Sequence, residues 1–244
     1  MPSTDDELRE RLLHAAEAQL IDSTDNDIAT RAVCEAAGVS QPVLYRLFGD
    51  KQGLLAALVD HGYARYIARK STLAVTDDVL ADLRAGWDDH MEFARTNPAV
   101  YRLMFSPNPN GKPTARRQIF DLLVATLRRV AAEGRMTIPP HVAAPAILSA
   151  NVGIALNRIT QPDLYDDPDL STRVREAIFA SFLTDVGDAR TEGAAVVDED
   201  GSALRTAAVH LAAQLDLNPS TPLVEEERAL LRRWLDVLSA PPTR

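Results

Sequence analysis

The sequence predicts an all-α protein in which a short N-terminal three-helix domain precedes a larger helical domain. Apolar residues recur every three or four positions in nearly every patterned segment, and no segment alternates strictly over the length of a strand. Gly38, Gly49, Asn97–Pro98 and Gly134 provide helix-ending signals between these segments. With 244 residues, 46% of them hydrophobic and 25% charged, the chain is large enough for a substantial core.

The first 50 residues predict three helices. The first covers residues 5–21, with acidic residues in its first turn, where the helix dipole favours them. A second helix covers residues 31–37 with Thr30 as its N-cap, and Gly38 ends it in a left-handed conformation. Ser40 is expected to cap the third helix, which carries Pro42 in its first turn and ends at residue 48.

Longer helices follow, and they define the domain prediction. We expect them at residues 51–70, 77–96, 99–105, 115–133, 140–160, 171–186, 202–215 and 223–238. Residues 1–50 are predicted to form the smaller N-terminal domain, and residues 51–190 the larger helical domain. Residues 191–244 are predicted to be a linker and a C-terminal helical extension that packs on the larger domain, with extra contact area for a second copy as the alternative.

Several protein classes lack their sequence signature here. The single Cys34 excludes an internal disulfide framework and is expected to be a small buried residue. The chain has no Cys-x-x-Cys pair, His-Glu-x-x-His motif or glycine-rich phosphate loop, so we predict neither an enzyme nor a cofactor. The acidic N-terminus is unlike a signal peptide and the run from Ala143 to Leu156 is too short for a bilayer, so a cytoplasmic protein without a membrane span is expected.

The two helices around Gly38 predict a helix-turn-helix. Its second helix divides into an inward face, Leu44, Leu47 and Phe48, and an outward face, Gln41, Pro42, Tyr45 and Arg46, which can contact base edges and phosphates. Thr30, Arg31 and Lys51 stand at helix starts, where they suit phosphate oxygens. The net charge of −9 opposes DNA binding, yet residues 30–51 carry a local charge of +1.

Residues 29–55, ATRAVCEAAGVSQPVLYRLFGDKQGLL, closely resemble the DNA-binding signature of TetR-type (TetR/AcrR) transcriptional repressors. Residues 97–105, NPAVYRLMF, resemble a segment common in the effector domains of that family. The resemblance implies operator contacts by Thr30, Gln41, Pro42, Tyr45 and Lys51. Two residues depart from the family pattern, because Val43 replaces a small or hydroxylated residue and Leu47 replaces a His.

The predicted DNA-binding set is therefore Thr30, Arg31, Ser40, Gln41, Pro42, Val43, Tyr45, Arg46 and Lys51, with Arg46 as the main sequence reader. The expected function is a homodimeric repressor that binds a palindromic double-stranded operator and leaves it when a small-molecule effector binds. A DNA-binding activator or co-regulator is the alternative. A helical enzyme or metal-binding protein is a more distant one, because the five His residues and one Cys form no catalytic constellation.

Residues 51–190 are predicted to be an effector-binding and dimerisation domain, with the dimer interface on two of its helices and packing within one chain as the alternative. Small residues at spacings of four and three let another helix approach residues 140–160, and an apolar face of the next helix completes a four-helix interface. The predicted residues are Ala146, Ala150, Gly153, Val174, Ile178 and Phe182.

An apolar effector cavity with a few polar groups is also expected. Its candidate residues are Trp87, His90, Met91, Tyr101, Met104, Phe105, Phe120 and Asn151, although each could also be plain core. The run Asp88-Asp89-His90 is not expected to bind metal, because adjacent helical residues point in different directions. Asp88, Asp89 and Glu92 are instead predicted to be a solvated face, with an indication of a cationic effector as the alternative.

Overall fold

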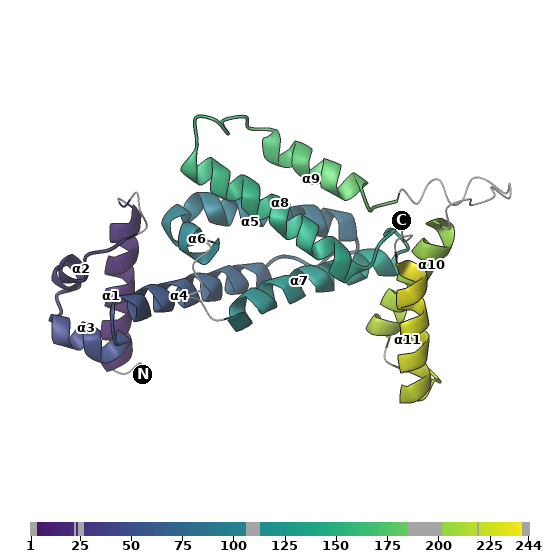
Figure 1. Ribbon diagram of the computed structural model, residues 1–244, viewed down its shortest axis with the longest axis horizontal. Coiled ribbons are helices and arrows are strands. Elements are labelled where there is room, and N and C mark those ends of the chain that lie inside the picture. Colours follow the sequence, from purple (N-terminus) through teal and green to yellow (C-terminus); the bar gives the residue numbers. More distant parts are fainter. Residues whose placement is uncertain are drawn as a thin grey trace. The chain divides into compact units, whose positions relative to one another are not determined.

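The computed structural model describes residues 4–21, 23, 27–105, 113–184, 202–218 and 220–240 (Figure 1). The described residues form α-helices joined by turns, and the only strand-like pairing among them is an isolated bridge between Met136 and Leu183. The predicted all-α class is therefore confirmed. The chain divides into two compact units, residues 1–73, 88–119 and 152–166 in unit 1 and residues 74–87, 120–151 and 167–244 in unit 2.

Unit 1 begins with the predicted three-helix arrangement. Its helices are α1 (Thr4–Ile21), α2 (Thr30–Ala37), α3 (Gln41–Phe48), α4 (Lys51–Ser71) and α6 (Pro98–Phe105). Helix α1 packs against α2, α3, α4 and α6. The purple helices α1 and α2 lie beside α3 and the start of α4 in Figure 1. Leu12, Leu20, Leu44 and Leu54 are fully buried, so one apolar core holds α3 onto α1 and the start of α4.

The remaining helices are α5 (Val79–Thr96), α7 (Pro113–Ala132), α8 (Pro140–Thr160), α9 (Leu170–Ala180), α10 (Ser202–Leu217) and α11 (Glu225–Ser239). Their bounds agree with the expected ranges within a few residues, except at α9. That helix ends six residues before the expected position 186. The backbone of residues 182–184 instead pairs with residues 135–137, as the Thr137 amide donates to the Phe182 carbonyl and the Thr184 amide to the Arg135 carbonyl.

Helices α10 and α11 form a hairpin inside unit 2 (Figure 1). Ala208 and Leu215 of α10 pack with Leu235 of α11 in a small apolar cluster. The hairpin is attached to α7, because Gln214 donates a 2.6 Å hydrogen bond to the Ala132 carbonyl. Residues 191–201, part of the predicted linker, lie outside the described residues.

Helix α8 has the length and composition of a membrane-crossing helix. The core helix of a globular protein has the same length and composition, so this one helix does not define a membrane protein. Its apolar character has a local explanation at Ala143, Ala144 and Ile147, which are buried in unit 2.

Candidate nucleic-acid interface and effector-domain interior

The turn between α2 and α3 is built around Gly38. Gly38 has a φ of 62°, and the amides of Gly38 and Val39 donate to the Glu35 and Cys34 carbonyls, which closes the end of α2. The guanidinium of Arg11 on α1 donates to the Ala37 carbonyl. A Cβ at residue 38 would lie 3.0 Å from the Arg11 Nη2 atom, so the turn requires glycine for its conformation, and a larger residue would also crowd the Arg11 side chain.

Helix α3 presents the predicted outward face. Leu44 is completely buried, whereas Tyr45 is 44% exposed and Gln41, Pro42 and Arg46 are also exposed. Ser40 occupies the expected N-cap position, although its side chain makes no capping hydrogen bond. This division of α3 into a buried side and an exposed side of amide, phenol and guanidinium groups is the one expected of the second helix of a helix-turn-helix, the reading helix.

Two details of the predicted packing are different. Leu47 and Phe48 are only partly buried, and both contact Arg9 of α1. Arg9 donates to the Leu47 carbonyl, and its guanidinium carbon lies 4.6 Å from the centre of the Phe48 ring. Val43 is half-buried and therefore contributes only part of its surface to the outward face.

The start of α2 also differs from expectation. Ala29, not Thr30, holds the N-cap position, and Thr30 is the first helical residue. The Ala29 carbonyl accepts from the Val33 amide, and the Ala29 amide donates to the side chain of Gln19 on α1. Thr30 is consequently half-buried at the helix start, where its hydroxyl does not cap α2.

The start of α4 depends on two residues whose role the sequence did not reveal. Asp50 caps the helix, since its carboxylate accepts a 2.7 Å hydrogen bond from the Gly53 amide. A Cβ at Gly53 would lie 1.9 Å from the Phe48 carbonyl oxygen. Glycine at this position lets α4 begin directly beneath the end of α3. The spacing Asp-x-x-Gly after the end of α3 is the sequence signal that could have predicted this cap.

The candidate DNA-binding cations are all paired with carboxylates. Arg46 forms a forked pair with Asp5, with Nη–Oδ distances of 2.7 and 2.8 Å. Lys51 pairs with Asp27, and the Arg31 Nε atom lies 3.0 Å from Glu35. The hydrogen bonds from Arg46 lower the pKa of the Asp5 carboxyl, and those from Lys51 lower the pKa of Asp27.

A buried polar chain lies inside unit 1, at the predicted effector residues His90 and Tyr101. The His90 Nδ1 atom lies 2.8 Å from the Tyr66 hydroxyl of α4, and its Nε2 atom lies 2.6 Å from the Tyr101 hydroxyl of α6. Burial lowers the pKa of His90 to about 3, and the charge of Lys70 acts in the same direction. The neutral imidazole thus connects α4, α5 and α6.

A second contact strengthens the connection between α4 and α6. The Tyr63 hydroxyl of α4 donates a 2.7 Å hydrogen bond to the Met104 carbonyl, while Arg116 donates to the same hydroxyl at 2.9 Å. Met104 is buried and Phe105 is half-buried against the Tyr63 and Tyr101 rings. Met91, the remaining candidate in this unit, is half-buried on α5.

Asp89 corrects the prediction of a solvated acidic face. It is 8% exposed and pairs with Arg69 and with Lys70, whose Nζ atom lies 2.9 Å away. Burial acts to raise the pKa of Asp89, but the two cations outweigh it and hold the pKa below its usual value. Among the described residues, no group of three or more His, Cys, Asp or Glu side chains is placed to hold a metal ion.

The other effector candidates lie in unit 2. Trp87 is buried, stacks edge-on against Phe179 and donates a 2.9 Å hydrogen bond to the Ser171 hydroxyl. Asn151 is 3% exposed; its Nδ2 atom lies 3.5 Å from the Trp87 carbonyl, and its Oδ1 atom has no hydrogen-bond partner among the described residues. Phe120 is half-buried. A buried acceptor beside Trp87 is a position where a ligand donor group would be stabilised.

A small hollow elsewhere in unit 2 does not coincide with these residues. It has a volume of about 90 Å³ and lies among α7, the start of α8 and the α10–α11 hairpin. Arg128 and Arg232 line it and share Asp216 as their ion-pair partner. Ligand pockets commonly measure roughly 300–1,000 Å³, so this hollow is too small to be the expected effector cavity.

The predicted dimer residues are mostly accessible. Ala146 is exposed, Ala150, Val174 and Ile178 are half-buried, and a Cβ at Gly153 would meet no atom within 4 Å. Phe182 is a correction, because it is 2% exposed and packs on Phe179 inside unit 2. The early end of α9 explains the difference, since the chain turns inward at that point and pairs with residues 135–137.

An exposed reading helix on a three-helix support, followed by a helical domain, defines a helix-turn-helix regulator. Family comparisons agree. Residues 12–58 match the model of bacterial regulatory proteins of the tetR family, and residues 83–238 match the tetracycline repressor-like C-terminal domain. The chain belongs to the TetR family of transcription regulators, and the predicted resemblance is confirmed.

Individual relatives are more distant. The HTH-type transcriptional activator FasR of Mycolicibacterium smegmatis is 29% identical over 115 residues, which is 47% of this chain and 52% of FasR. The matched region therefore spans about half the length of this curated relative.

Solved structures share the fold at lower identity. SmeT, the repressor of the Stenotrophomonas maltophilia multidrug efflux pump SmeDEF, is 20% identical with a TM-score of 0.60, covering 73% of this chain and 91% of SmeT. A protein from Rhodococcus sp. RHA1 is 22% identical with a TM-score of 0.62, covering 72% of this chain and 96% of its own. The fatty acid degradation regulator FadR of Bacillus halodurans is 15% identical with a TM-score of 0.58, covering 70% and 97%.

Proposed function

We propose that this transcription regulator binds a palindromic DNA operator through α3 of two symmetry-related copies. The observation that carries the proposal is the exposed face of Gln41, Pro42, Tyr45 and Arg46 on a helix fixed by the buried Leu44. Thr30, Arg31 and Ser40 stand at the starts of α2 and α3, and Lys51 begins α4, where each can reach a phosphate oxygen.

The test is a gel-shift assay across the DNA that flanks the protein's own gene. We expect one region to bind at least a hundredfold more tightly than a random duplex of equal length, because specific complexes usually exceed non-specific ones by about 10³ or more. Equal affinity for every fragment would refute operator recognition.

We propose a homodimer because one α3 reads only a few base pairs, whereas two read a palindrome. The exposed Ala146 and the open space around Gly153 support close approach of a second α8, and Val174 and Ile178 add apolar surface on α9. In this proposal residues 1–50 bind DNA, residues 51–190 pair and bind the effector, and the later helices pack on the effector domain in a cytoplasmic protein.

Repression by the effector-free protein is the proposed activity, with release when a small molecule binds the effector domain. Activation has one specific observation in its favour, because FasR is a transcriptional activator. In vitro transcription from the bound promoter separates the two. Added protein should lower transcript yield for a repressor and raise it for an activator.

We propose that the effector contacts the buried residues around Asn151 and Trp87 in unit 2. The unpartnered Asn151 Oδ1 atom supports this, as does the position of Trp87 beside it. The chain has two tryptophans, so a Trp234→Phe variant leaves Trp87 as the only indole reporter. In a screen of small apolar molecules bearing a hydrogen-bond donor, effectors should change Trp87 fluorescence and also abolish the gel shift. Molecules that abolish the shift without changing the fluorescence would place the site elsewhere.

A further inference from the structure

The first turn of α1 contacts the last turn of the reading helix through one ion pair. The Asp5 carboxylate accepts from both Nη atoms of Arg46, at 2.7 and 2.8 Å, across 41 residues of sequence. Side chains of both residues are about half exposed, so the pair lies on the surface, at the outward face of α3 that also carries Tyr45.

This geometry occupies only part of the guanidinium. Arginine has five N–H donors in a planar fork, and the end-on pair with Asp5 uses one from each Nη atom. The Nε–H group and one donor on each Nη atom are left, so a base edge can be read from the side of the fork. A phosphate oxygen that approaches Arg46 instead meets a neutral pair with a carboxylate in front.

The Asp5 carboxylate affects the affinity of non-specific and operator complexes differently, because the two depend on charge to different degrees. Non-specific binding depends on cations that neutralise phosphates, whereas operator binding adds hydrogen bonds to base edges. Neutralising Arg46 therefore weakens the non-specific complex more than the specific one. Discrimination between partners often uses such a repulsive element.

We propose that Asp5 is a specificity-determining residue, which prevents Arg46 from serving as a general phosphate contact and reserves it for a base in the operator. This inference rests on the proposed function of α3. It assigns a role in DNA recognition to a carboxylate outside the helix-turn-helix.

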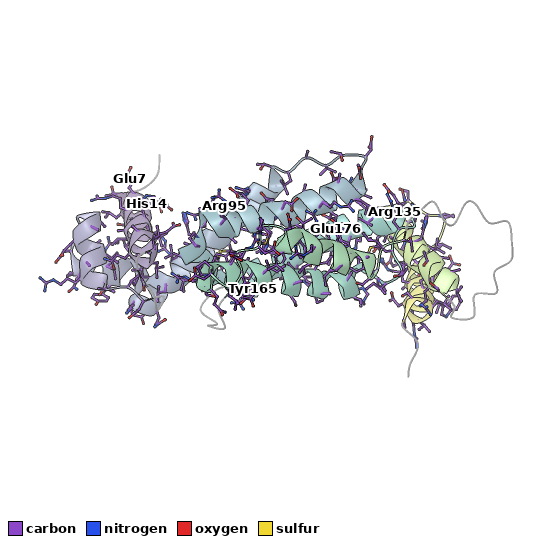
Figure 2. All side chains as sticks on the ribbon, turned by 90° about the horizontal axis from the view of Figure 1, so that it is seen from above. Glu7, His14, Arg95, Arg135, Tyr165 and Glu176 are labelled. Atoms are coloured by element: carbon purple, nitrogen blue, oxygen red, sulfur yellow. The ribbon has the colours of Figure 1, made fainter. Side chains whose placement is uncertain are left out.

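The test compares Asp5→Asn with Glu7→Gln in the full chain. Glu7 provides the matched control because it stands in the same first turn, carries the same charge and is exposed, as its place on α1 in Figure 2 shows. Both changes remove one negative charge from the helix start, so they have the same effect on the helix dipole. Only Asp5→Asn breaks the pair with Arg46.

Dissociation constants are measured over a range of KCl concentrations with two 30-bp duplexes, the tightest one selected from a random library and a scrambled version of it. Asp5→Asn should bind the scrambled duplex about tenfold more tightly at 0.1 M KCl, with a log–log salt slope steeper by roughly one to two for a dimer. Affinity for the selected duplex should change less than threefold, so the ratio of the affinity for the selected duplex to that for the scrambled duplex falls. Glu7→Gln should leave the ratio unchanged.

A third variant connects the effect to Arg46. In an Arg46→Ala background, Asp5→Asn should no longer change the ratio of affinities, because the carboxylate then has no guanidinium to restrain. Equal effects of Asp5→Asn and Glu7→Gln would overturn the inference, and so would a loss of operator affinity with unchanged random binding, which would make Asp5 a support for Arg46. If the unaltered protein prefers no duplex, the proposed function itself fails.

Discussion

At the scale of single residues, we expect position on a helix to separate two kinds of proposed DNA contact. Arg46 lies on the exposed face of α3, where it can reach base edges, whereas Lys51 stands at the first position of α4, where a phosphate oxygen is the accessible partner. Arg46 is held by a forked pair with Asp5, whereas Lys51 has a single contact with Asp27, so the Lys51 ammonium can turn toward a phosphate oxygen. Their substitution should therefore have different consequences for sequence preference.

Arg46→Ala should weaken operator binding by about 5- to 100-fold and reduce the preference for operator over random DNA. Lys51→Ala should weaken both complexes by similar factors and reduce the salt slope by about one per subunit. Competitive gel shifts with operator and random duplexes measure both changes. Equal losses on both duplexes for both variants would contradict this division of roles.

A second prediction concerns His90 and the dependence of the free energy of unfolding on pH. Its pKa in the folded protein is lowered to about 3 by burial, against an ordinary value of 6.5 in the unfolded chain. Between these values the unfolded chain binds more protons, so stability falls as the pH drops below 6.5. The contribution of His90 should be a loss of about 2 kcal/mol at pH 5.

The measurement is the free energy of unfolding at pH 7 and at pH 5, for the unaltered protein and for His90→Gln. Glutamine can still bond to the Tyr66 and Tyr101 hydroxyls but does not titrate, so its loss between the two pH values should be smaller. Identical pH dependence in both proteins would show that His90 does not carry this effect.

At the scale of helices, periodicity and stop signals predicted most of the fold, including α8 with its bounds at residues 140 and 160. These local signals gave wrong predictions where contacts between residues distant in sequence determine the structure. The end of α9 depends on backbone pairing with residues 135–137, and the burial of Asp89 depends on Arg69 and Lys70 from α4. The Asp5–Arg46 pair joins residues too far apart in sequence for any local pattern to show it.

The crossing of α4 and α6 provides a test of packing between elements. A Cβ at Gly62 of α4 would lie 2.4 Å from Val100 Cγ1 and 2.8 Å from Met104 Sδ, both on α6. Gly62→Ala should therefore destabilise the protein by about 1–3 kcal/mol through overpacking.

Gly86 of α5 is the matched control, since a Cβ there meets no atom within 4 Å. Gly86→Ala should stabilise the protein by up to about 1 kcal/mol, as alanine favours a helix interior. Thermal and denaturant unfolding compare the two variants. If Gly62→Ala were as stable as Gly86→Ala, the close approach of α4 and α6 would be disproved.

At the scale of the whole molecule, the proposed activity requires two copies, and the exposed part of α8 is where we expect them to meet. Ala146→Glu places a charge on that surface without disturbing a buried side chain. The substitution should reduce the mass in solution from that of a dimer toward the monomer mass of 26.6 kDa. It should also weaken operator binding at least tenfold.

Ala85→Glu gives the control, because Ala85 is an exposed alanine on α5, outside the proposed interface. Analytical ultracentrifugation at micromolar concentration measures the mass of each variant. A dimer that persists in Ala146→Glu, or one that is lost equally in both variants, would place the interface elsewhere.

The most direct test of the central claim is methylation interference on a selected operator duplex. Methylation of guanine N7 blocks the major groove, into which α3 is proposed to insert. We predict that methylation abolishes binding at two symmetric half-sites, separated by about 10 bp or a multiple of it. Binding that tolerates methylation throughout the duplex, or that is sensitive at a single unpaired site, would contradict a dimer that reads DNA with α3.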